Sequence, residues 1–271
     1  MTADVLSTDL ANLEPLALPF VRADESTLSL HFNLSTTQSR MVSQRPFDLD
    51  LPYTKTMMGF LLALPRPAHI LMIGLGGGSL AKFCYRHMPE TRMTVVEINP
   101  YVKAMRQRFL IPDDDTRFSV VCADGAAFVR DARPEFDVIL VDGFDAQGQA
   151  SALSTQAFYD HCRRCLTGHS LMVVNLDEGH PDHLLFVQRI RQAFADQVLM
   201  LDVDERDNCI VLAGKGVSLA ASDMSLNAAL DHHAADVQSQ LRSEFERILR
   251  AVHKLEPLAP DVSLRFPGLT F

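Results

Sequence analysis

Carboxylate side chains follow three successive apolar runs in the middle of the chain, and their positions suit chemistry. Asp142 and Asp145 come after the apolar run Val138–Val141, while Glu97 and Asp124 stand at or just after the ends of the two preceding runs. The carboxyl ends of parallel strands meet at one edge of an open α/β sheet, where such sheets bind their ligands. Carboxylates placed there can accept protons or hold cations, whereas the alternative for each aspartate is capping of a loop or helix.

A glycine-rich loop precedes these acids. Gly74, Gly76 and Gly78 lie between an apolar run and a helical pattern. Bare backbone at a helix N-terminus predicts that a nucleotide-like ligand lies across the loop; the alternative is a tight strand-to-helix turn without a ligand. Ser79 stands where the dinucleotide fingerprint requires its last glycine, which disfavours a nicotinamide cofactor.

Two later positions complete a predicted nucleoside site. Glu97 ends an apolar run roughly 20 residues after the glycines, where a carboxylate can accept hydrogen bonds from ribose hydroxyls. Asp124 can accept a hydrogen bond from an adenine amino group, and Gly125 allows the ring to approach. The alternatives are an ordinary surface glutamate and an aspartate that caps the next helix.

Strands alternating with helices must position these residues. The predicted strands are Ile70–Ile73, Met93–Val96, Phe118–Val121, Val138–Val141 and Leu171–Val174. This alternation predicts an α/β fold with a doubly wound parallel sheet. The runs Val198–Val203 and Cys209–Ala213 are too close for a crossover helix and must pair as an antiparallel hairpin. The expected fold is therefore the S-adenosylmethionine-type Rossmann-like sheet rather than the nicotinamide type.

Smaller segments flank this sheet. Residues between Pro19 and Phe47 have the alternation of a small β domain, and Tyr53 to Leu64 reads as an amphipathic helix. One long helix is expected from an N-cap at Ser222 to about His253, followed by an extended tail over Pro257–Phe271. We therefore expect an N-terminal β segment over residues 1–52, a catalytic domain over 53–220 and a C-terminal helix and tail over 221–271.

Composition narrows the classes of partner. The net charge is −9, which argues against a nucleic-acid partner, and no apolar run is long enough for a membrane span. Five scattered cysteines favour a reducing, cytoplasmic location. Cys162 and Cys165 have the spacing of metal ligands, but they lie in a helical pattern with no second pair, so no metal is expected.

Taken together, these motifs resemble those of the spermidine synthase (polyamine aminopropyltransferase) family. The family hallmark D-x-x-D-x-x-G-x-A-x-x-L, followed by an aromatic-Tyr pair, is matched in register by the residues Asp142, Asp145, Gly148, Ala150, Leu153, Phe158 and Tyr159. The glycine loop, Glu97 and Asp124-Gly125 also match, so the resemblance covers roughly residues 36–213.

The resemblance implies an enzyme that moves an aminopropyl group from decarboxylated S-adenosylmethionine to a small-molecule amine such as putrescine. It implies that Asp142 is the base that deprotonates the amine and that Asp145 orients it. Gln38 and Tyr53 resemble family residues that reach the ligand from the N-terminal side. A homodimer is also implied.

One departure keeps alternatives open. The family loop usually carries an aspartate that binds the aminopropyl ammonium, and this chain has Gly77 there. Loss of that charge makes the site more tolerant of the carboxylate of intact S-adenosylmethionine, so a methyltransferase is a second hypothesis. A non-catalytic homologue that binds an adenosyl ligand is a third.

Overall fold

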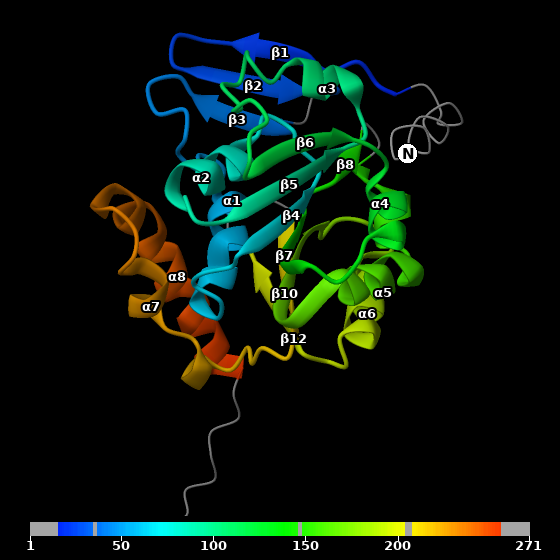
Figure 1. The fold of residues 1–271 in the computed structure, drawn as a ribbon, viewed down its shortest axis with the longest axis vertical. Coiled ribbons are helices and arrows are strands. Elements are labelled where there is room, and N and C mark those ends of the chain that lie inside the picture. Colours follow the sequence, from blue (N-terminus) through cyan, green and yellow to red (C-terminus); the bar gives the residue numbers. More distant parts are fainter. Residues whose placement is uncertain (1–15, 35–36, 146–147, 204–207, 256–271) are drawn as a thin grey trace, which may run out of the picture.

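The computed structural model describes residues 16–34, 37–145, 148–203 and 208–255. The expected tail over Pro257–Phe271 lies outside the described residues. Figure 1 shows a central sheet flanked by helices, with a small sheet above it.

A seven-stranded sheet forms the centre of the fold. Its strands are β4 (His69–Ile73), β5 (Arg92–Glu97), β6 (Phe118–Cys122), β7 (Phe136–Val141), β10 (Leu166–Asp177), β11 (Val198–Asp202) and β12 (Asn208–Lys215), in the order β11-β12-β10-β7-β4-β5-β6. The five strands from β10 to β6 are parallel, while β12 is antiparallel to both of its neighbours. The expected parallel sheet closed by an antiparallel hairpin is therefore confirmed.

Alternation along the strands divides the core into two layers. Ile70 and Met72 of β4 pack into one cluster of buried residues, whereas Leu71 and Ile73 pack into the other. The helices whose buried residues join the first cluster are α1 (Pro52–Met57), α2 (Ser79–His87), α3 (Pro100–Ala104), α7 (Leu226–Leu230) and α8 (Ala235–Leu255); those of the second are α4 (Gly125–Asp131), α5 (Gln156–Cys165) and α6 (His183–Ala193). Both faces are covered because every parallel strand is apolar on both sides.

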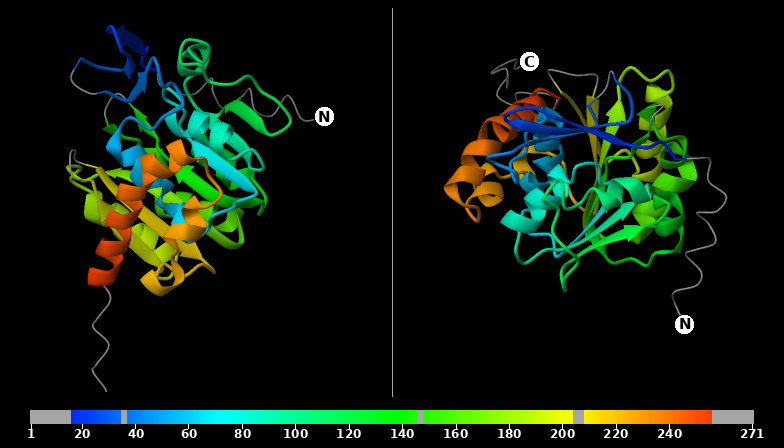
Figure 2. Two further views of the ribbon diagram at one scale, coloured as in Figure 1. Left: turned by 90° about the vertical axis from the view of Figure 1, so that its left-hand side faces the viewer. Right: turned by 90° about the horizontal axis from the view of Figure 1, so that it is seen from above.

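The predicted N-terminal β segment forms a separate three-stranded sheet. It consists of β1 (Phe20–Ala23), β2 (Thr27–His31) and β3 (Ser39–Val42), paired antiparallel in that order. Viewed from above, its strands run across the top of the central sheet (Figure 2). The Ser39 hydroxyl lies 3.2 Å from that of Ser79, so β3 contacts the first turn of α2 directly.

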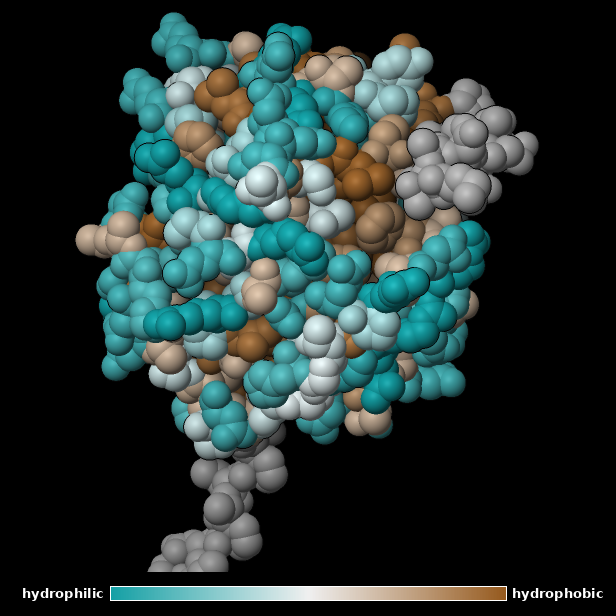
Figure 3. Space-filling view, in the orientation of Figure 1, coloured by the Kyte–Doolittle hydropathy of each residue, from teal (hydrophilic) through white to brown (hydrophobic). Residues whose placement is uncertain are grey.

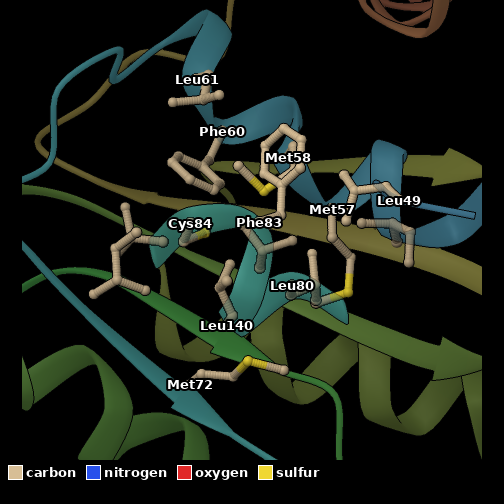
Figure 4. Close-up of a cluster of buried hydrophobic side chains, with 14 of the residues drawn as sticks. Leu49, Met57, Met58, Phe60, Leu61, Met72, Leu80, Phe83, Cys84 and Leu140 are labelled. Atoms are coloured by element: carbon tan, nitrogen blue, oxygen red, sulfur yellow. The ribbon is translucent and has the colours of Figure 1, made fainter. Parts of the chain in front are cut away.

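The helix expected over Tyr53–Leu64 is present but changes its winding. α1 ends at Met57 and continues as a 3₁₀ helix, η2 (Met58–Leu62). A Cβ atom on Gly59 would lie 2.8 Å from Cδ1 of Ile248, so the glycine lets α8 approach closely. Figure 4 shows the side chains of this segment packed above Leu80 and Phe83 of α2.

The single long helix expected from Ser222 is wrong. The structure has a short 3₁₀ helix, η4 (Ala221–Asp223), then α7 and α8 separated by a turn. The N-cap of α7 is Ser225, whose Oγ accepts a hydrogen bond from the Ala228 amide, 3.1 Å away. The break falls at the run Asp231-His-His, whose residue types have low helix propensity. The apolar residues before and after the break fit one helical stripe, so the pattern did not reveal it.

The face in Figure 3 is mainly hydrophilic. Among the helices of the described ranges, none is long and apolar enough to cross a bilayer.

The domain boundaries expected at residues 52 and 220 stay predictions. One cluster of buried residues includes side chains from both sides of each boundary.

Candidate functional site

The glycine loop lies against Asp142 at the point where the order of strands in the sheet reverses direction. The chain leaves β4 toward β5 on one side, and β7 later pairs with β4 on the other side. Such a switch point leaves a crevice at the carboxyl ends of the strands. Gly74 has φ +93°, and a Cβ atom there would lie 2.2 Å from the carbonyl oxygen of Asp142. Gly74 thus brings the loop against the end of β7.

A cavity of about 910 Å³ opens at this edge. Its walls include nine of the ten residues predicted for the site, namely Gln38, Tyr53, Gly74, Gly76, Glu97, Asp124, Gly125, Asp142 and Asp145. The central sheet, α1 and the N-terminal segment all contribute walls, so the cavity lies between the two sheets.

Gly78 is the predicted residue that does not line this cavity. It caps α2 with φ +72°, and a Cβ atom there would lie 2.5 Å from the side chain of Ile111. Its role is therefore to let the turn pack against Ile111. Gly76, with φ +52°, faces the cavity, and the nearest atom to a Cβ at that position would be Cβ of Ser39, 3.6 Å away.

Glu97 is a buried carboxylate fixed by backbone amides. It is 7% exposed, its Oε2 accepts from the Leu75 amide at 2.8 Å, and its Oε1 accepts from the Asn99 amide at 2.8 Å. Burial raises the pKa of Glu97, and these backbone hydrogen bonds oppose the rise. Glu97 also lines the cavity, so its carboxylate is placed to accept from vicinal hydroxyls of a ligand.

Asp124 combines both roles considered for it. Its Oδ1 accepts from the amides of Ala126 and Ala127, which makes it the N-cap of α4. Asp124 also lines the cavity, and Oδ2 is left to accept from a ligand. Next to it, a Cβ on Gly125 would lie 2.5 Å from Cγ2 of Ile73, so the close packing of α4 on β4 also requires this glycine.

Asp142 is held by donors on both of its oxygens. The Tyr53 hydroxyl donates to Oδ2 at 3.1 Å, and the Asn175 amide donates to Oδ1 at 2.9 Å. Burial raises the pKa of Asp142, while these two hydrogen bonds lower it. The net effect is a raised pKa, and a buried carboxylate of raised pKa is a stronger base toward a bound amine than a solvated one.

Asp145 lies on the exposed side of the same cavity. It belongs to β8 (Phe144–Asp145), which pairs with β9 (Gly148–Gln149). The hairpin is tied to the end of β10 because Oε1 of Gln149 accepts from the Asp177 amide at 3.1 Å. Asp177 also lines the cavity, so the hairpin and β10 present two carboxylates at its mouth.

The sequence did not single out Asn175, Asn208 and Lys82. Asn175 lies in β10 beside Asp142, because Val174 and Val141 before them are paired, and its place directly after the predicted strand Leu171–Val174 was the available signal for it. Asn208 reaches the cavity from the antiparallel hairpin, which no local pattern indicates. Lys82 is 1% exposed behind the glycine loop, where its Nζ donates to the Phe109 carbonyl at 2.8 Å.

The cavity is entirely acidic in its charged groups. Its described walls hold the carboxylates of Glu97, Asp124, Asp142, Asp145 and Asp177, and they include no Arg, Lys or His. Carboxylates gathered in one cavity favour cations. Within the described ranges, no three His, Cys, Asp or Glu side chains are grouped to hold a metal ion.

Gly77 is too enclosed to carry the acid that the family resemblance leads one to expect. A Cβ there would lie 2.7 Å from the Ser39 hydroxyl and 2.9 Å from the Phe109 ring. Gly77 does not line the cavity. The absent charge is thus accompanied by packing that fills its place.

Known proteins are similar to this chain in sequence or in fold. A polyamine aminopropyltransferase of Chromobacterium violaceum is 39% identical over 200 residues, which cover 73% of this chain and 77% of that protein. A crystal structure of a probable spermidine synthase from Corynebacterium glutamicum has a TM-score of 0.65 at 18% identity, covering 81% of this chain and 87% of that one. Human methyltransferase-like protein 13, solved with SAH, has a TM-score of 0.55 at 22% identity, covering 80% and 98%. The two structures bear on the fold alone.

The family itself is settled by sequence. The family model described as the spermine/spermidine synthase domain matches residues 51–199, more than half of the chain. The matched region contains the glycine loop, Glu97, Asp124 and the Asp142–Asp145 pair. The resemblance and the transferase class expected from these motifs are therefore confirmed, and the chain belongs to the spermine/spermidine synthase family.

Proposed function

We propose that this chain transfers the aminopropyl group of decarboxylated S-adenosylmethionine to a polyamine such as putrescine. Membership in the spermine/spermidine synthase family and the polyamine aminopropyltransferases among its relatives support this activity. The proposal also assigns a role to each predicted site residue that lines the cavity.

The observation that carries the proposal is the charge of the cavity. Both reactants of an aminopropyl transfer are cations, a sulfonium with an alkylammonium tail and a protonated polyamine. Five carboxylates without a described cation in the walls suit both of them. Intact S-adenosylmethionine would bring a carboxylate into the same cavity, where no positive side chain among the described wall residues could pair with it, and this disfavours the methyltransferase hypothesis.

The donor half of the cavity is built from residues of β4, β5 and the loop before α4. Gly74 and Gly76 leave the backbone bare, Glu97 accepts from the ribose hydroxyls, and Asp124 accepts from the adenine amino group through Oδ2. Gln38 closes this half from the N-terminal side. Adenosyl binding is thus assigned to Gln38, Tyr53, Gly74, Gly76, Glu97, Asp124 and Gly125.

The acceptor half contains the reacting groups. An alkylamine has a pKa near 10.4 and arrives protonated at neutral pH, so it needs a base before it can attack. Asp142 takes that proton and Asp145 orients the amine. The nitrogen lone pair then forms a C–N bond to the carbon beside the sulfonium as the C–S bond breaks, and the sulfur leaves as the neutral thioether methylthioadenosine.

Calorimetry and turnover test the proposal together. The chain is titrated with decarboxylated S-adenosylmethionine, intact S-adenosylmethionine and methylthioadenosine, and product formation from putrescine is followed. Tighter binding of the decarboxylated donor, with turnover, is expected. Preference for the intact donor would instead support a methyltransferase, and binding without turnover of any polyamine would support the non-catalytic homologue.

Substitution of Asp142 tests its role. Asp142→Asn should keep methylthioadenosine affinity and lose most turnover, because asparagine cannot take the proton. Asp137→Asn is the matched control: Asp137 begins the same strand, and its Oδ2 accepts from the Ala68 amide at 2.8 Å at the opposite edge of the sheet. Unchanged turnover in Asp142→Asn would show that Asp142 is not the base.

Location and assembly belong to the same proposal. All five cysteines are free, which supports the reducing cytoplasm as the location. A homodimer is proposed from the family resemblance alone. Light scattering on the purified chain measures its mass, and a monomer at enzyme concentrations would exclude the dimer.

A further inference from the structure

Three polar side chains form a line across three neighbouring strands, from the cavity toward the edge hairpin. Asp142 follows β7, Asn175 lies in β10, and Asn208 begins β12. Nδ2 of Asn175 lies 2.9 Å from Oδ1 of Asp142, and Nδ2 of Asn208 lies 2.9 Å from Oδ1 of Asn175. All three residues line the cavity.

The orientation of the Asn175 amide decides what Asp142 meets. An ionised carboxylate only accepts hydrogen bonds, so Asn175 must turn its NH₂ group toward Asp142 and its carbonyl away. Asn175 is 2% exposed, and its carbonyl oxygen receives its hydrogen bond from Asn208. A rotated amide would place its carbonyl against Asp142 and leave the NH₂ groups of both asparagines facing each other. By donating to the Asn175 carbonyl, Asn208 supports the orientation that suits an ionised Asp142.

We propose that Asn208 is a positioning residue for aminopropyl transfer, which acts through Asn175 to keep a hydrogen-bond donor on the Asp142 carboxylate. The inference rests on the proposed function, in which Asp142 is the base. The family motif does not contain Asn208, and nothing near it in sequence marks it as functional.

The expected consequence is a change in the pH dependence of turnover. Burial raises the pKa of Asp142 and donation from Asn175 lowers it, so losing the orientation of Asn175 lets the pKa rise. The titratable groups that face Asp142 across the cavity are those of Tyr53, Glu97, Asp124, Asp145 and Asp177. These groups and the amine substrate are unchanged in the Asn208→Leu variant described below, so a shift in that variant reports on Asp142, whereas Asn208→Asp adds one further titratable carboxylate.

Two substitutions separate orientation from shape. Asn208→Leu has nearly the same shape and no hydrogen-bonding group, so it frees the Asn175 carbonyl. Asn208→Asp is also nearly isosteric, but its carboxylate only accepts, so it draws the Asn175 NH₂ group away from Asp142 and adds a negative charge. Turnover is measured against pH with saturating decarboxylated S-adenosylmethionine and putrescine.

The acid limb of the kcat profile should move to higher pH by roughly half a unit to one unit in Asn208→Leu and by more in Asn208→Asp. On that limb kcat falls about three- to tenfold, and on the plateau it stays within about twofold. A uniform loss at all pH values, or an unmoved limb in both variants, overturns the proposal. Asn227→Asp, on the exposed surface of α7, is the charge control and should leave the profile unchanged.

A double substitution tests whether Asn208 acts through Asn175. Asn175→Leu alone should move the acid limb, and adding Asn208→Leu should move it no further, since the intermediary is already lost. Additive shifts would overturn the proposed path. If Asp142→Asn retains turnover, the base assignment fails; if it is inactive while the Asn208 variants keep the wild-type limb, this inference alone fails.

Discussion

The Tyr53 hydroxyl donates a hydrogen bond to Oδ2 of Asp142 across 3.1 Å, although the two residues are 89 positions apart. Tyr53 lies in α1, which precedes the central sheet, and Asp142 directly follows β7. This contact closes the cavity beside the glycine loop and supplies one of the two donors on the proposed base.

Tyr53→Phe should therefore impair chemistry more than donor binding. Hydrogen bonds to charged groups contribute on the order of 1.5–3 kcal/mol, so kcat should fall about tenfold or more. Methylthioadenosine affinity should fall less, because phenylalanine keeps the ring that lines the adenosyl half of the cavity. Steady-state kinetics and calorimetry measure the two effects. Tyr101→Phe, half exposed on α3, is the control. Equal losses in both quantities would show that Tyr53 supports the whole cavity rather than Asp142.

Gly74→Ala should destabilise the fold. A methyl group there would lie 2.2 Å from the Asp142 carbonyl oxygen at a φ of +93°, so the loop and the end of β7 must separate. We expect a loss of at least about 2 kcal/mol in the free energy of unfolding, measured by denaturant titration. Gly168→Ala is the matched control, because a Cβ at Gly168 meets nothing within 4 Å. Similar stability of both variants would contradict the close approach.

Glu97→Gln should weaken the binding of every adenosyl ligand. The two carboxylate oxygens accept from the Leu75 and Asn99 amides, and a glutamine would turn one NH₂ group against a backbone N–H. Calorimetry with methylthioadenosine should give an affinity lower by about ten- to a hundredfold. Glu135→Gln, half exposed just before β7, should bind normally. Wild-type affinity in Glu97→Gln would reject the ribose assignment.

Lys82 should give the chain a measurable pH dependence of stability. Burial lowers the pKa of Lys82 from 10.5 to about 8. Between these two values the unfolded chain keeps a proton that the folded chain has released, so this group makes stability rise with pH. Below about pH 8 both states are protonated and the contribution is constant.

The comparison with Lys82→Met isolates that effect. The free energy of unfolding of the wild type minus that of the variant should increase by about 1–3 kcal/mol from pH 8 to 10. Other titrating groups cancel in the difference. A difference that stays constant with pH would mean that Lys82 is neutral, or charged, in both states throughout this range.

Local pattern was enough to predict the elements that carry the site. The strands of the parallel sheet are short apolar runs, and their carboxyl ends must share an edge, so Glu97, Asp124 and Asp142 could be assigned to one crevice before any coordinates. The glycine loop and the closing hairpin followed from residue type and loop length. These features depend on residues that are close together in the sequence, so the sequence pattern can predict them.

Tertiary contacts decided the rest. Gly78 has the same residue type as Gly76, yet Ile111 occupies the space beside it, so it packs while Gly76 faces the cavity. Asn208 reaches Asn175, the partner of Asp142, because β12 returns antiparallel beside β10. The turn between α7 and α8 interrupts an apolar stripe that α8 resumes. The sequence by itself determined the succession of strands and helices that builds the central sheet, and the acids at the ends of its strands. Only the tertiary structure decided which side chains share the cavity, because that depends on packing between residues far apart in the chain.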